Sequence, residues 1–192
     1  MRDFIFRKKN VVSQEDCDKI IDFFESNPNS HLQGTVGSEE KLVPSDKIST
    51  EILLNVTHCN SLNEIIWKAM TQSVEEYKKI FPFLDSGVRR WEVNTIMKIQ
   101  RYKPGEGYFV EHCENAGFSG ESVGGDKRMM AWMIYLNDVR DGGYTEFPTQ
   151  RKKFQPRRGD VLIWPAYWTH PHKGVTSKSQ TKYIITGWYV YK

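Results

Sequence analysis

The second half of the chain consists of short β-rich segments with no helical pattern between them. These segments are rich in β-branched and aromatic residues and cover residues 89–101, 108–114, 128–137, 152–156, 160–164 and 181–191. Short links containing Gly, Pro and Asp separate them. Strands joined by such links favour an antiparallel sandwich or barrel over a βαβ fold.

Helical patterns occur only upstream of these segments. Ser13 followed by Asp16 resembles a capping box, and apolar residues at helical spacing predict a helix over residues 14–26. A second apolar face begins at Ser61 and ends near Pro82. We therefore expect two helices that support the β-rich part.

The segment between the two helices, residues 30–50, shows no period and contains glycines and a proline. It is predicted to be a loop. Residues 115–127 contain four glycines and are also predicted to be a loop. Long loops in a small domain are often functional, so both are candidates for a lid over a substrate, or are plain surface loops.

Size and composition indicate a folded domain. Hydrophobic residues make up 39% of the 192 residues and aromatic residues 13%, which excludes a disordered chain. We expect a single domain over residues 1–192, in which residues 1–87 form a helical N-terminal region and residues 88–192 the β core.

The formal net charge is only +3, and no apolar stretch approaches the length of a membrane span. Neither a nucleic-acid partner nor a membrane is expected; charge and sequence do not give the oligomeric state.

The cysteines indicate a reducing compartment. Cys17, Cys59 and Cys113 are odd in number and widely spaced, without a CxxC pair, so neither a disulfide framework nor a cysteine zinc site is indicated. The N-terminus lacks the long apolar region of a signal peptide. We therefore expect a cytoplasmic protein.

A histidine and a carboxylate stand two residues apart in one β-rich segment. On a strand, the side chains of His112 and Glu114 would project from the same face and could reach one metal ion. Two further histidines, His170 and His172, lie downstream in WPAYWTHPHKG. Two histidines and one carboxylate form the facial triad of non-haem Fe(II) oxygenases. An HxE pair alone is weak evidence, because it is also common on solvated surfaces.

Several motifs in a fixed order strengthen this interpretation. In chain order they are YKPGEGYFVEHCE (102–114), Arg128, YLND (135–138), GGYTEFP (142–148), QPRRGDVLIWP (155–165) and His172, followed by Lys182 and Trp188. Together they resemble the prolyl-4-hydroxylase-like 2-oxoglutarate/Fe(II)-dependent dioxygenase family over about residues 90–191.

The resemblance implies a fold and a site. The fold would be mainly β with helices (α+β), a double-stranded β-helix (jelly-roll) core with N-terminal supporting helices. The Fe(II) ligands would be His112, Glu114 and His172, because the ten residues from His172 to Lys182 match the family spacing better than the twelve from His170. The remaining site residues would be Lys182 and Tyr135 at the far carboxylate of 2-oxoglutarate, Tyr102 at the metal pocket, and His170 and Trp188 beside the ligands. Glu114 departs from the family's usual Asp, but glutamate also binds iron.

The implied reaction is hydroxylation of an unactivated C–H bond by O2 and 2-oxoglutarate, with release of succinate and CO2 and with ascorbate as reductant. Peptidyl-proline 4-hydroxylation is the leading hypothesis. Alternatives are a hydroxylase of a free amino acid, another small molecule or a nucleobase on the same fold. A non-catalytic jelly-roll binding module is disfavoured, since it needs no metal ligands beside Lys182.

Overall fold

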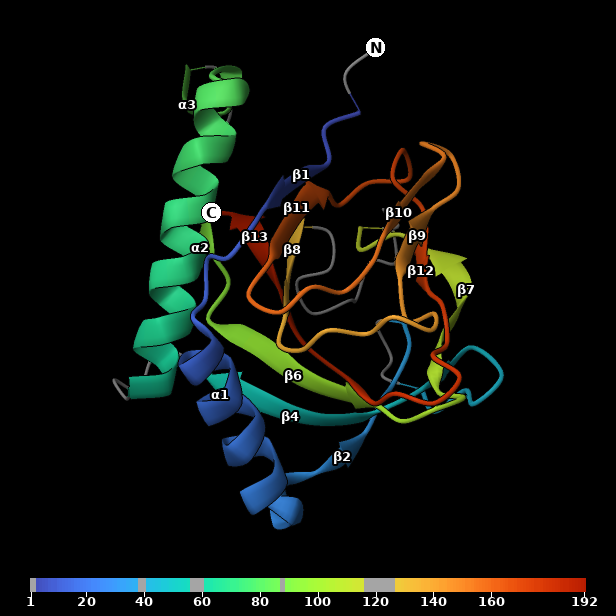
Figure 1. The fold of residues 1–192 in the computed structure, drawn as a ribbon. Coiled ribbons are helices and arrows are strands. Elements are labelled where there is room, and N and C mark those ends of the chain that lie inside the picture. Colours follow the sequence, from blue (N-terminus) through green and yellow to red (C-terminus); the bar gives the residue numbers. More distant parts are fainter. Residues whose placement is uncertain (1–2, 38–40, 56–60, 87–88, 116–126) are drawn as a thin grey trace.

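The strands form two antiparallel sheets that face each other (Figure 1). The computed structural model describes residues 3–37, 41–55, 61–86, 89–115 and 127–192. The larger sheet contains β1 (Phe6–Lys8), β2 (Leu32–Gln33), β4 (Thr50–Asn55), β5 (Trp91–Val93), β6 (Ile96–Tyr102), β8 (Arg128–Tyr135), β11 (Val161–Pro165) and β13 (Lys182–Tyr191). The smaller sheet contains β3 (Lys47–Ile48), β7 (Gly107–His112), β9 (Thr145–Phe147), β10 (Lys152–Phe154) and β12 (His172–Gly174).

The order of strands is non-sequential in both sheets. It is β1-β11-β8-β13-β6-β4-β2 in the larger sheet, where β5 also pairs with β13, and β10-β9-β12-β7-β3 in the smaller sheet. Strands distant in sequence are therefore neighbours, as β13 is of both β6 and β8. This arrangement brings residues from the whole second half of the chain to the space between the sheets.

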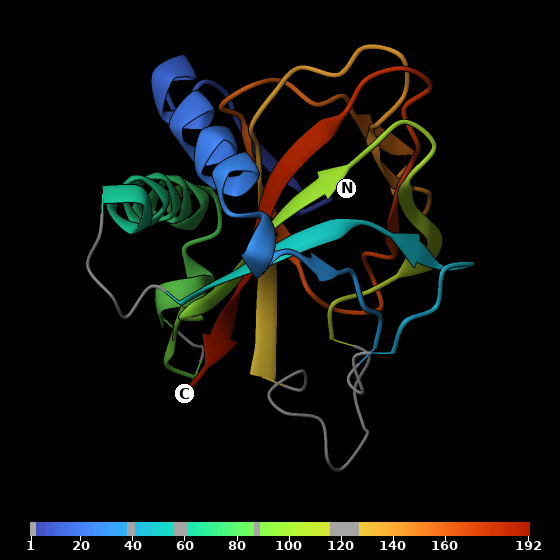
Figure 2. The same cartoon turned by 90° about the horizontal axis from the view of Figure 1, so that it is seen from below.

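Two long helices cover the outer face of the larger sheet (Figures 1 and 2). They are α1 (Gln14–Ser26) and α2 (Ser61–Ile80), and the short α3 (Phe83–Ser86) and a 3-10 turn (Pro28–Ser30) complete the helical part. The Ser13 side chain accepts a hydrogen bond from the Asp16 amide at 3.1 Å, which caps α1. Both predicted helices are thus confirmed. No helix in the described part of the chain is long and apolar enough to cross a membrane.

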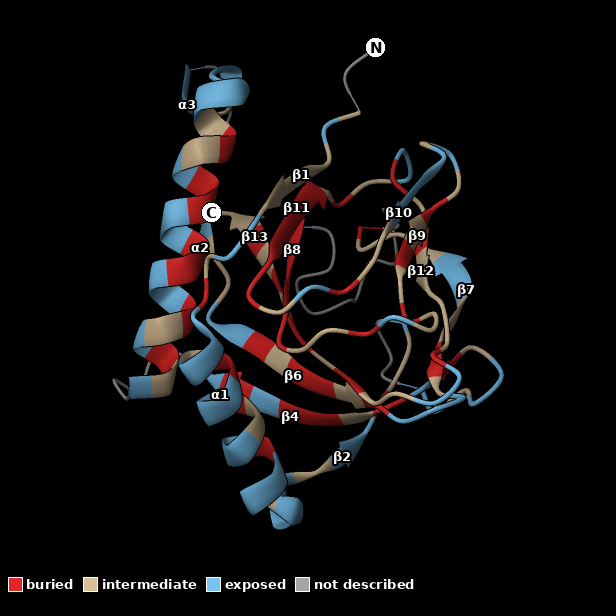
Figure 3. Cartoon of the chain, in the orientation of Figure 1, coloured by how far each residue is buried: buried red, intermediate tan, exposed pale blue. Residues whose placement is uncertain are grey.

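Alternate residues of the central strands belong to two different cores. On β8, Trp132 and Ile134 pack with α1 and α2, whereas Met133 and Tyr135 point between the two sheets. This explains why residues 128–137 are apolar at nearly every position: both faces of β8 are covered. Buried residues on α2 lie at helical spacing, interleaved with exposed ones (Figure 3).

The N-terminal region is not only helical, which differs from the prediction. Residues 30–50 were expected to form a loop, but β2 and β3 lie within them and β4 begins at Thr50. β2 and β3 have only two residues each, and their place is fixed by pairing with distant strands, so no local pattern marks them. β9 and β12 were missed for the same reason. Most of the predicted loop 115–127 lies outside the described residues.

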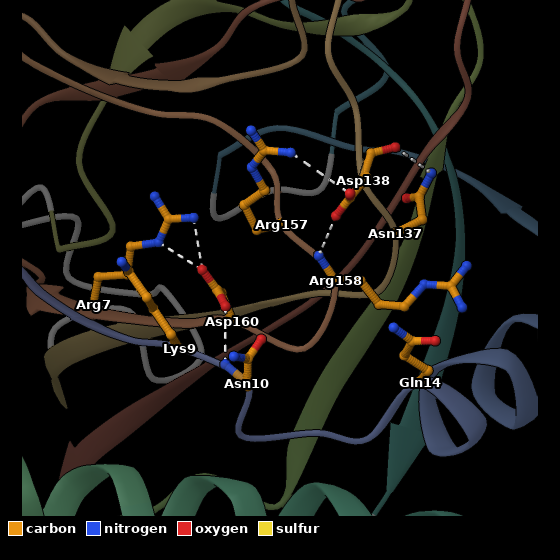
Figure 4. Close-up of a pocket in the computed structure, with 9 residues that line it drawn as sticks. All are labelled: Arg7, Lys9, Asn10, Gln14, Asn137, Asp138, Arg157, Arg158 and Asp160. Atoms are coloured by element: carbon orange, nitrogen blue, oxygen red, sulfur yellow. Dashed lines mark hydrogen bonds and ion pairs between the residues drawn. The ribbon is translucent and has the colours of Figure 1, made fainter.

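The N-terminal strand is held to the larger sheet beside a polar pocket (Figure 4). The pocket is lined by Arg7, Lys9, Asn10, Gln14, Asn137, Asp138, Arg157, Arg158 and Asp160. Arg7 Nη2 lies 2.6 Å from Asp160 Oδ2, and the Asn10 amide donates to Asp160 Oδ1 at 3.0 Å. The backbone amide of Arg158 donates to Asp138 Oδ1 at 2.8 Å. Both carboxylates of the pocket therefore have partners: Asp160 fastens the β1 segment to the start of β11, and Asp138 fastens the segment after β8 to the turn before β11.

Candidate metal centre

Two histidines and a glutamate converge at the junction of β7 and β12. In the antiparallel pairing of these strands, His172 lies directly opposite His112. Glu114 Oε1 lies 3.6 Å from His112 Nε2 and 3.3 Å from His172 Nε2. One ligand atom from each residue lies within 4.8 Å of the other two. The sheet thus places a two-histidine, one-carboxylate set around one point.

Glu114 reaches this point by a different route from the predicted one. β7 ends at His112, so Glu114 does not share a strand face with it. Beyond the strand, the Asn115 amide donates to the Ala166 carbonyl at 2.8 Å, and the Asn115 side chain donates to the Arg128 carbonyl at 2.8 Å. These bonds turn the chain toward the larger sheet, and the Glu114 carboxylate is left facing both histidines.

Both histidine rings are held with Nε2 facing the carboxylate. His112 Nδ1 lies 3.2 Å from the Val110 carbonyl, and His172 Nδ1 lies 3.1 Å from the His170 carbonyl. Because a carbonyl can only accept, each Nδ1 carries the ring proton when the histidine is neutral. Each Nε2 is left on the Glu114 side. It presents a lone pair, as a metal ligand must, when the ring is neutral, and it donates to the Glu114 carboxylate when the ring is protonated.

Aromatic rings support the two histidines. The Tyr108 ring stacks on His112 with centroids 3.5 Å apart. His172 is buried, and its ring centroid lies 5.2 Å from that of Phe147 and 5.0 Å from that of Trp164. These contacts restrict the rings and remove water from one side of the cluster.

Glu114 has two further partners in the larger sheet. Trp188 Nε1 donates to Glu114 Oε2 at 2.8 Å, and Arg128 Nη1 lies 3.8 Å from the same oxygen. The Arg128 guanidinium also lies over the Trp188 ring, 3.7 Å from its centroid. Burial alone would raise the pKa of Glu114, but hydrogen bonds and charge from His112 and His172 hold it well below its usual range. The carboxylate is therefore ionised at neutral pH.

His170 lies beside the cluster and its ring faces elsewhere. Its Nε2 lies 2.8 Å from the Asp3 carbonyl, and its Nδ1 lies 2.8 Å from Thr169 Oγ1. Only its backbone carbonyl contacts His172. The structure thus brings His172, and not His170, to His112 and Glu114, while Trp188 contacts a ligand directly.

A buried lysine lies deeper between the sheets. Lys182 is 3% exposed, and its Nζ donates to the Gly143 carbonyl at 3.1 Å. Gly143 has a φ of +68°, a conformation suited to glycine. No carboxylate of the described residues forms an ion pair with Lys182, and burial lowers its pKa to about 8. A buried ammonium without a counterion is stabilised when an anionic ligand binds beside it.

Of the two predicted tyrosines, one contacts this lysine and the other bonds elsewhere. Tyr102 is opposite Lys182 in the pairing of β6 and β13, and the Lys182 Nζ lies 4.8 Å from the Tyr102 ring centroid. Tyr135 is fully buried, and its hydroxyl lies 2.7 Å from Thr145 Oγ1 and 3.2 Å from the Phe154 carbonyl. In this structure the Tyr135 hydroxyl is bonded within the protein, so its predicted contact with a carboxylate would require an exchange of partners.

The structure adds residues to which the sequence assigned no role. Arg128 and Tyr108 contact the ligands, and a charged group formed by Lys47, Glu51 and Lys98 lies on the inner side of the strands. Arg128 and Tyr108 fall inside the recognised motifs. Of the charged group, Lys98 alternates with apolar residues on β6, whereas Lys47 lies in the segment predicted to be a loop, where no local pattern marked it.

The donor set fits an iron(II) ion. Two imidazole nitrogens and one carboxylate oxygen leave coordination positions open, as in non-haem Fe(II) oxygenases. The ligand atoms lie close enough to share one ion, and the unpaired Lys182 ammonium on the opposing sheet provides an anion site between the same two sheets. These residues therefore suit both a metal and a dicarboxylate.

Comparison with known proteins gives the family. Residues 97–190 match the family model of the 2OG-Fe(II) oxygenase superfamily. A protein of Acanthamoeba polyphaga mimivirus that carries the name of a prolyl 4-hydroxylase is 30% identical over 106 residues, which are 48% of this chain and 43% of the relative. The Arabidopsis thaliana protein named "Probable prolyl 4-hydroxylase 3" is 24% identical over 182 residues, 85% of this chain and 58% of the relative. The chain thus spans about half the length of these relatives.

Solved structures show the same fold. The viral collagen prolyl hydroxylase of Paramecium bursaria Chlorella virus-1, in its 2OG complex, superposes with a TM-score of 0.71 at 20% identity, covering 98% of this chain and 97% of that one. A Pseudomonas putida prolyl-4-hydroxylase gives a TM-score of 0.72 at 14% identity, covering 97% and 92%. The predicted mainly β fold with a double-stranded β-helix core is confirmed. The resemblance in the sequence is confirmed as well: residues 97–190 form a domain of the 2OG-Fe(II) oxygenase superfamily, and prolyl 4-hydroxylases are among the relatives of the chain.

Proposed function

We propose that this protein is an Fe(II)- and 2-oxoglutarate-dependent dioxygenase that hydroxylates a C–H bond, with a peptidyl proline as the leading substrate. The observation that carries the proposal is the convergence of His112, Glu114 and His172 on one point, with the unpaired Lys182 buried between the same two sheets. Family membership and the names of the relatives support it.

In this proposal, each residue has a defined task. His112, Glu114 and His172 would hold iron(II), which when bound supplies the O2-dependent conversion of 2-oxoglutarate to succinate and CO2 coupled to substrate hydroxylation. Lys182 would bind the far carboxylate of 2-oxoglutarate through a charge-assisted hydrogen bond. Tyr102 lies against that ammonium and would help to enclose the co-substrate.

The surrounding residues would keep the ligands oriented. Trp188 donates to the Glu114 oxygen that does not face the histidines, so it fixes the carboxylate and leaves Oε1 for the metal. Phe147 and Trp164 pack on His172 and exclude water from that side of the centre. Exclusion of water protects a reactive oxidant from side reactions.

The test is the release of succinate or CO2 from 2-oxoglutarate in the presence of Fe(II), with a panel of proline-containing peptides and with free proline. His112→Ala is the control, because it removes a ligand without touching Lys182. We expect Fe(II)-dependent turnover by the wild-type protein and none by the variant. Absence of both Fe(II)-dependent 2-oxoglutarate binding and turnover in the wild-type protein would disprove the proposal.

The proposal includes ascorbate as the reductant that restores iron(II), and omission of ascorbate should shorten the time course of turnover.

The proposal also includes a cytoplasmic location, which is supported by Cys17 and Cys113, both free thiols in the structure. Fractionation of cells that express the protein would test the location.

A further inference from the structure

A buried charged cluster, Lys47, Glu51 and Lys98, lies on the inner side of β3, β4 and β6. On β6, Met97 and Ile99 pack in the core beneath the helices, so Lys98 and Gln100 point the other way, between the two sheets. Lys47 and Glu51 are 5% and 2% exposed. The cluster is therefore inside the β core, where charged residues are rare.

The cluster carries an excess of positive charge. Glu51 Oε1 contacts Lys47 Nζ and accepts hydrogen bonds from Ser49 Oγ at 3.0 Å and Gln100 Nε2 at 3.1 Å. Glu51 Oε2 lies 3.1 Å from Lys98 Nζ. Burial would raise the pKa of Glu51, but Lys47 and Lys98 hold it below its usual value. One carboxylate thus faces two ammonium groups.

Contacts connect this cluster to the metal centre. Lys47 Nζ lies 5.3 Å from the centroid of Tyr108, the ring that stacks on His112. Lys98 is opposite Thr186 in the pairing of β6 and β13. Trp188 is the next residue on that face of β13 and bonds to Glu114, so Lys98 and Trp188 are diagonal neighbours, roughly 7–8 Å apart at the backbone.

A second chain of contacts leads to the lysine proposed to bind 2-oxoglutarate. The Tyr102 hydroxyl donates to Gln100 Oε1 at 2.9 Å, and Lys182 lies over the Tyr102 ring. The charged cluster therefore lies beside both the metal centre and the co-substrate site, and is separate from each.

Stability alone does not account for the cluster. Buried ion pairs are often no more stabilising than apolar residues of similar volume. The far carboxylate of 2-oxoglutarate already has a candidate partner in Lys182. An ammonium can donate three hydrogen bonds, whereas Lys98 contacts only Glu51 among the described residues and its side chain is 17% exposed. Lys98 therefore has donors left for a ligand.

We propose that the charged cluster, with Lys98 as the contact residue, recognises a carboxylate of the substrate. This inference rests on the proposed function and narrows its substrate class. The carboxylate could belong to an acidic residue next to the reacting one in a peptide, or to the α-carboxylate of a free amino acid or of a peptide C-terminus. Both sources present the same chemistry to Lys98, and the experiment distinguishes them.

The experiment compares matched proline-containing peptides whose neighbouring residue is Glu, Gln or Lys, each with a free or an amidated C-terminus, together with free proline. The measured quantities are kcat/KM from succinate and hydroxylated product, and KM for 2-oxoglutarate. We expect the wild-type protein to prefer substrates with a carboxylate by about 10–100-fold, the range of a charge-assisted hydrogen bond. Loss of the preference on changing Glu to Gln identifies a side chain, and loss on amidation identifies a C-terminus.

Three variants test the role of the charges. Lys98→Met should reduce the preference to near one, and Lys98→Glu should shift it toward the Lys-containing peptide. Glu51→Gln removes the only negative charge of the cluster and should preserve or increase the preference. Lys68→Met, on the exposed face of α2, is the matched control and should behave as the wild-type protein.

Binding of the same peptides to the metal-free protein, measured by calorimetry, provides a readout independent of turnover. Charge-dependent peptide binding, in a protein that shows neither Fe(II)-dependent 2-oxoglutarate binding nor turnover, would support this inference while contradicting the proposed function. Turnover with no charge preference in the wild-type protein would overturn the inference alone. The inference is also overturned if Lys98→Met lowers kcat/KM equally for all peptides, or raises only KM for 2-oxoglutarate, since a structural or co-substrate role predicts those results.

Discussion

The two faces of the larger sheet are built from the same strands but differ in chemistry. The outer face meets α1 and α2 through apolar side chains such as Trp132, Ile134 and Ile185, all fully buried. The inner face has an apolar cluster of its own, but it also carries charged side chains, among them Lys98 and Lys182. Both faces therefore supply folding free energy, but the inner face also holds groups that are costly to bury.

This difference separates stability from function along the strands. Burial of an apolar side chain contributes about 1.5–3 kcal/mol, whereas a buried ammonium without a counterion is unfavourable. The outer face can therefore offset the cost of the inner face. Substitutions on the outer face should mainly lower the free energy of unfolding, and substitutions of the charged residues on the inner face should mainly change ligand binding.

The largest effect is expected at the metal ligands. His172→Ala removes a ligand whose Nε2 faces Glu114 and should abolish iron binding, a loss beyond the about 100-fold expected when a residue next to a ligand is changed. His170→Ala should retain iron binding, because His170 contacts His172 only through its backbone carbonyl. Titration with Fe(II) under anaerobic conditions measures both. A stronger loss of iron affinity in His170→Ala than in His172→Ala would show that His170, and not His172, is the ligand.

On the outer face, the expected effect is on unfolding. Ile134→Ala leaves a cavity against the helices and should lower the free energy of unfolding by about 2–5 kcal/mol, as measured by urea denaturation. Iron affinity of the folded variant should stay unchanged, since Ile134 points away from the metal centre. A parallel loss of iron affinity would show that the two faces are not independent.

The outer face is also the part of the fold that the sequence predicts well. Apolar residues at helical spacing located α1 and α2, and runs such as residues 128–137 located the central strands. Hydrophobic patterning is a local property of the sequence, so it identifies a helix or strand in any fold that buries the apolar face of that element. Strands of two or three residues, such as β3 and β12, depend on pairing with distant partners and have no such pattern.

The functional residues between the two sheets were predicted only where family motifs cover them. His112, Glu114, His172 and Lys182 stand in recognisable spacing, and the structure brings the first three together. Lys98 and Gln100 alternate with apolar residues on β6, a pattern typical of a solvated face. Alternation shows that two faces differ, but it does not show that the polar face is enclosed by a second sheet. That information is in the topology.

Substitution of Lys182 should weaken ligand binding and at the same time stabilise the ligand-free fold. Lys182→Met should weaken 2-oxoglutarate binding by about 1.5–3 kcal/mol, the range for a hydrogen bond to a charged group. It should also raise the free energy of unfolding of the ligand-free protein, because an unpaired buried ammonium is replaced by an apolar side chain. Calorimetry and urea denaturation measure the two quantities, and Lys68→Met serves as the exposed control. Weaker binding together with lower stability would indicate a structural role for Lys182.

The smallest expected effect, about 1.4 kcal/mol for each pH unit, is a pH dependence that Lys182 imposes on both quantities. Burial lowers its pKa from 10.5 to about 8, so above about pH 8 the folded protein releases a proton that the unfolded chain keeps until about pH 10.5. The unfolded state then binds more protons, and the contribution of Lys182 to the free energy of unfolding rises with pH across this window. Anion binding requires the charged lysine, so 2-oxoglutarate affinity should instead fall, by about tenfold for each pH unit above the pKa. Both slopes should disappear in Lys182→Met, whereas a 2-oxoglutarate affinity that is constant from pH 7 to about pH 10 would show that Lys182 does not bind the anion.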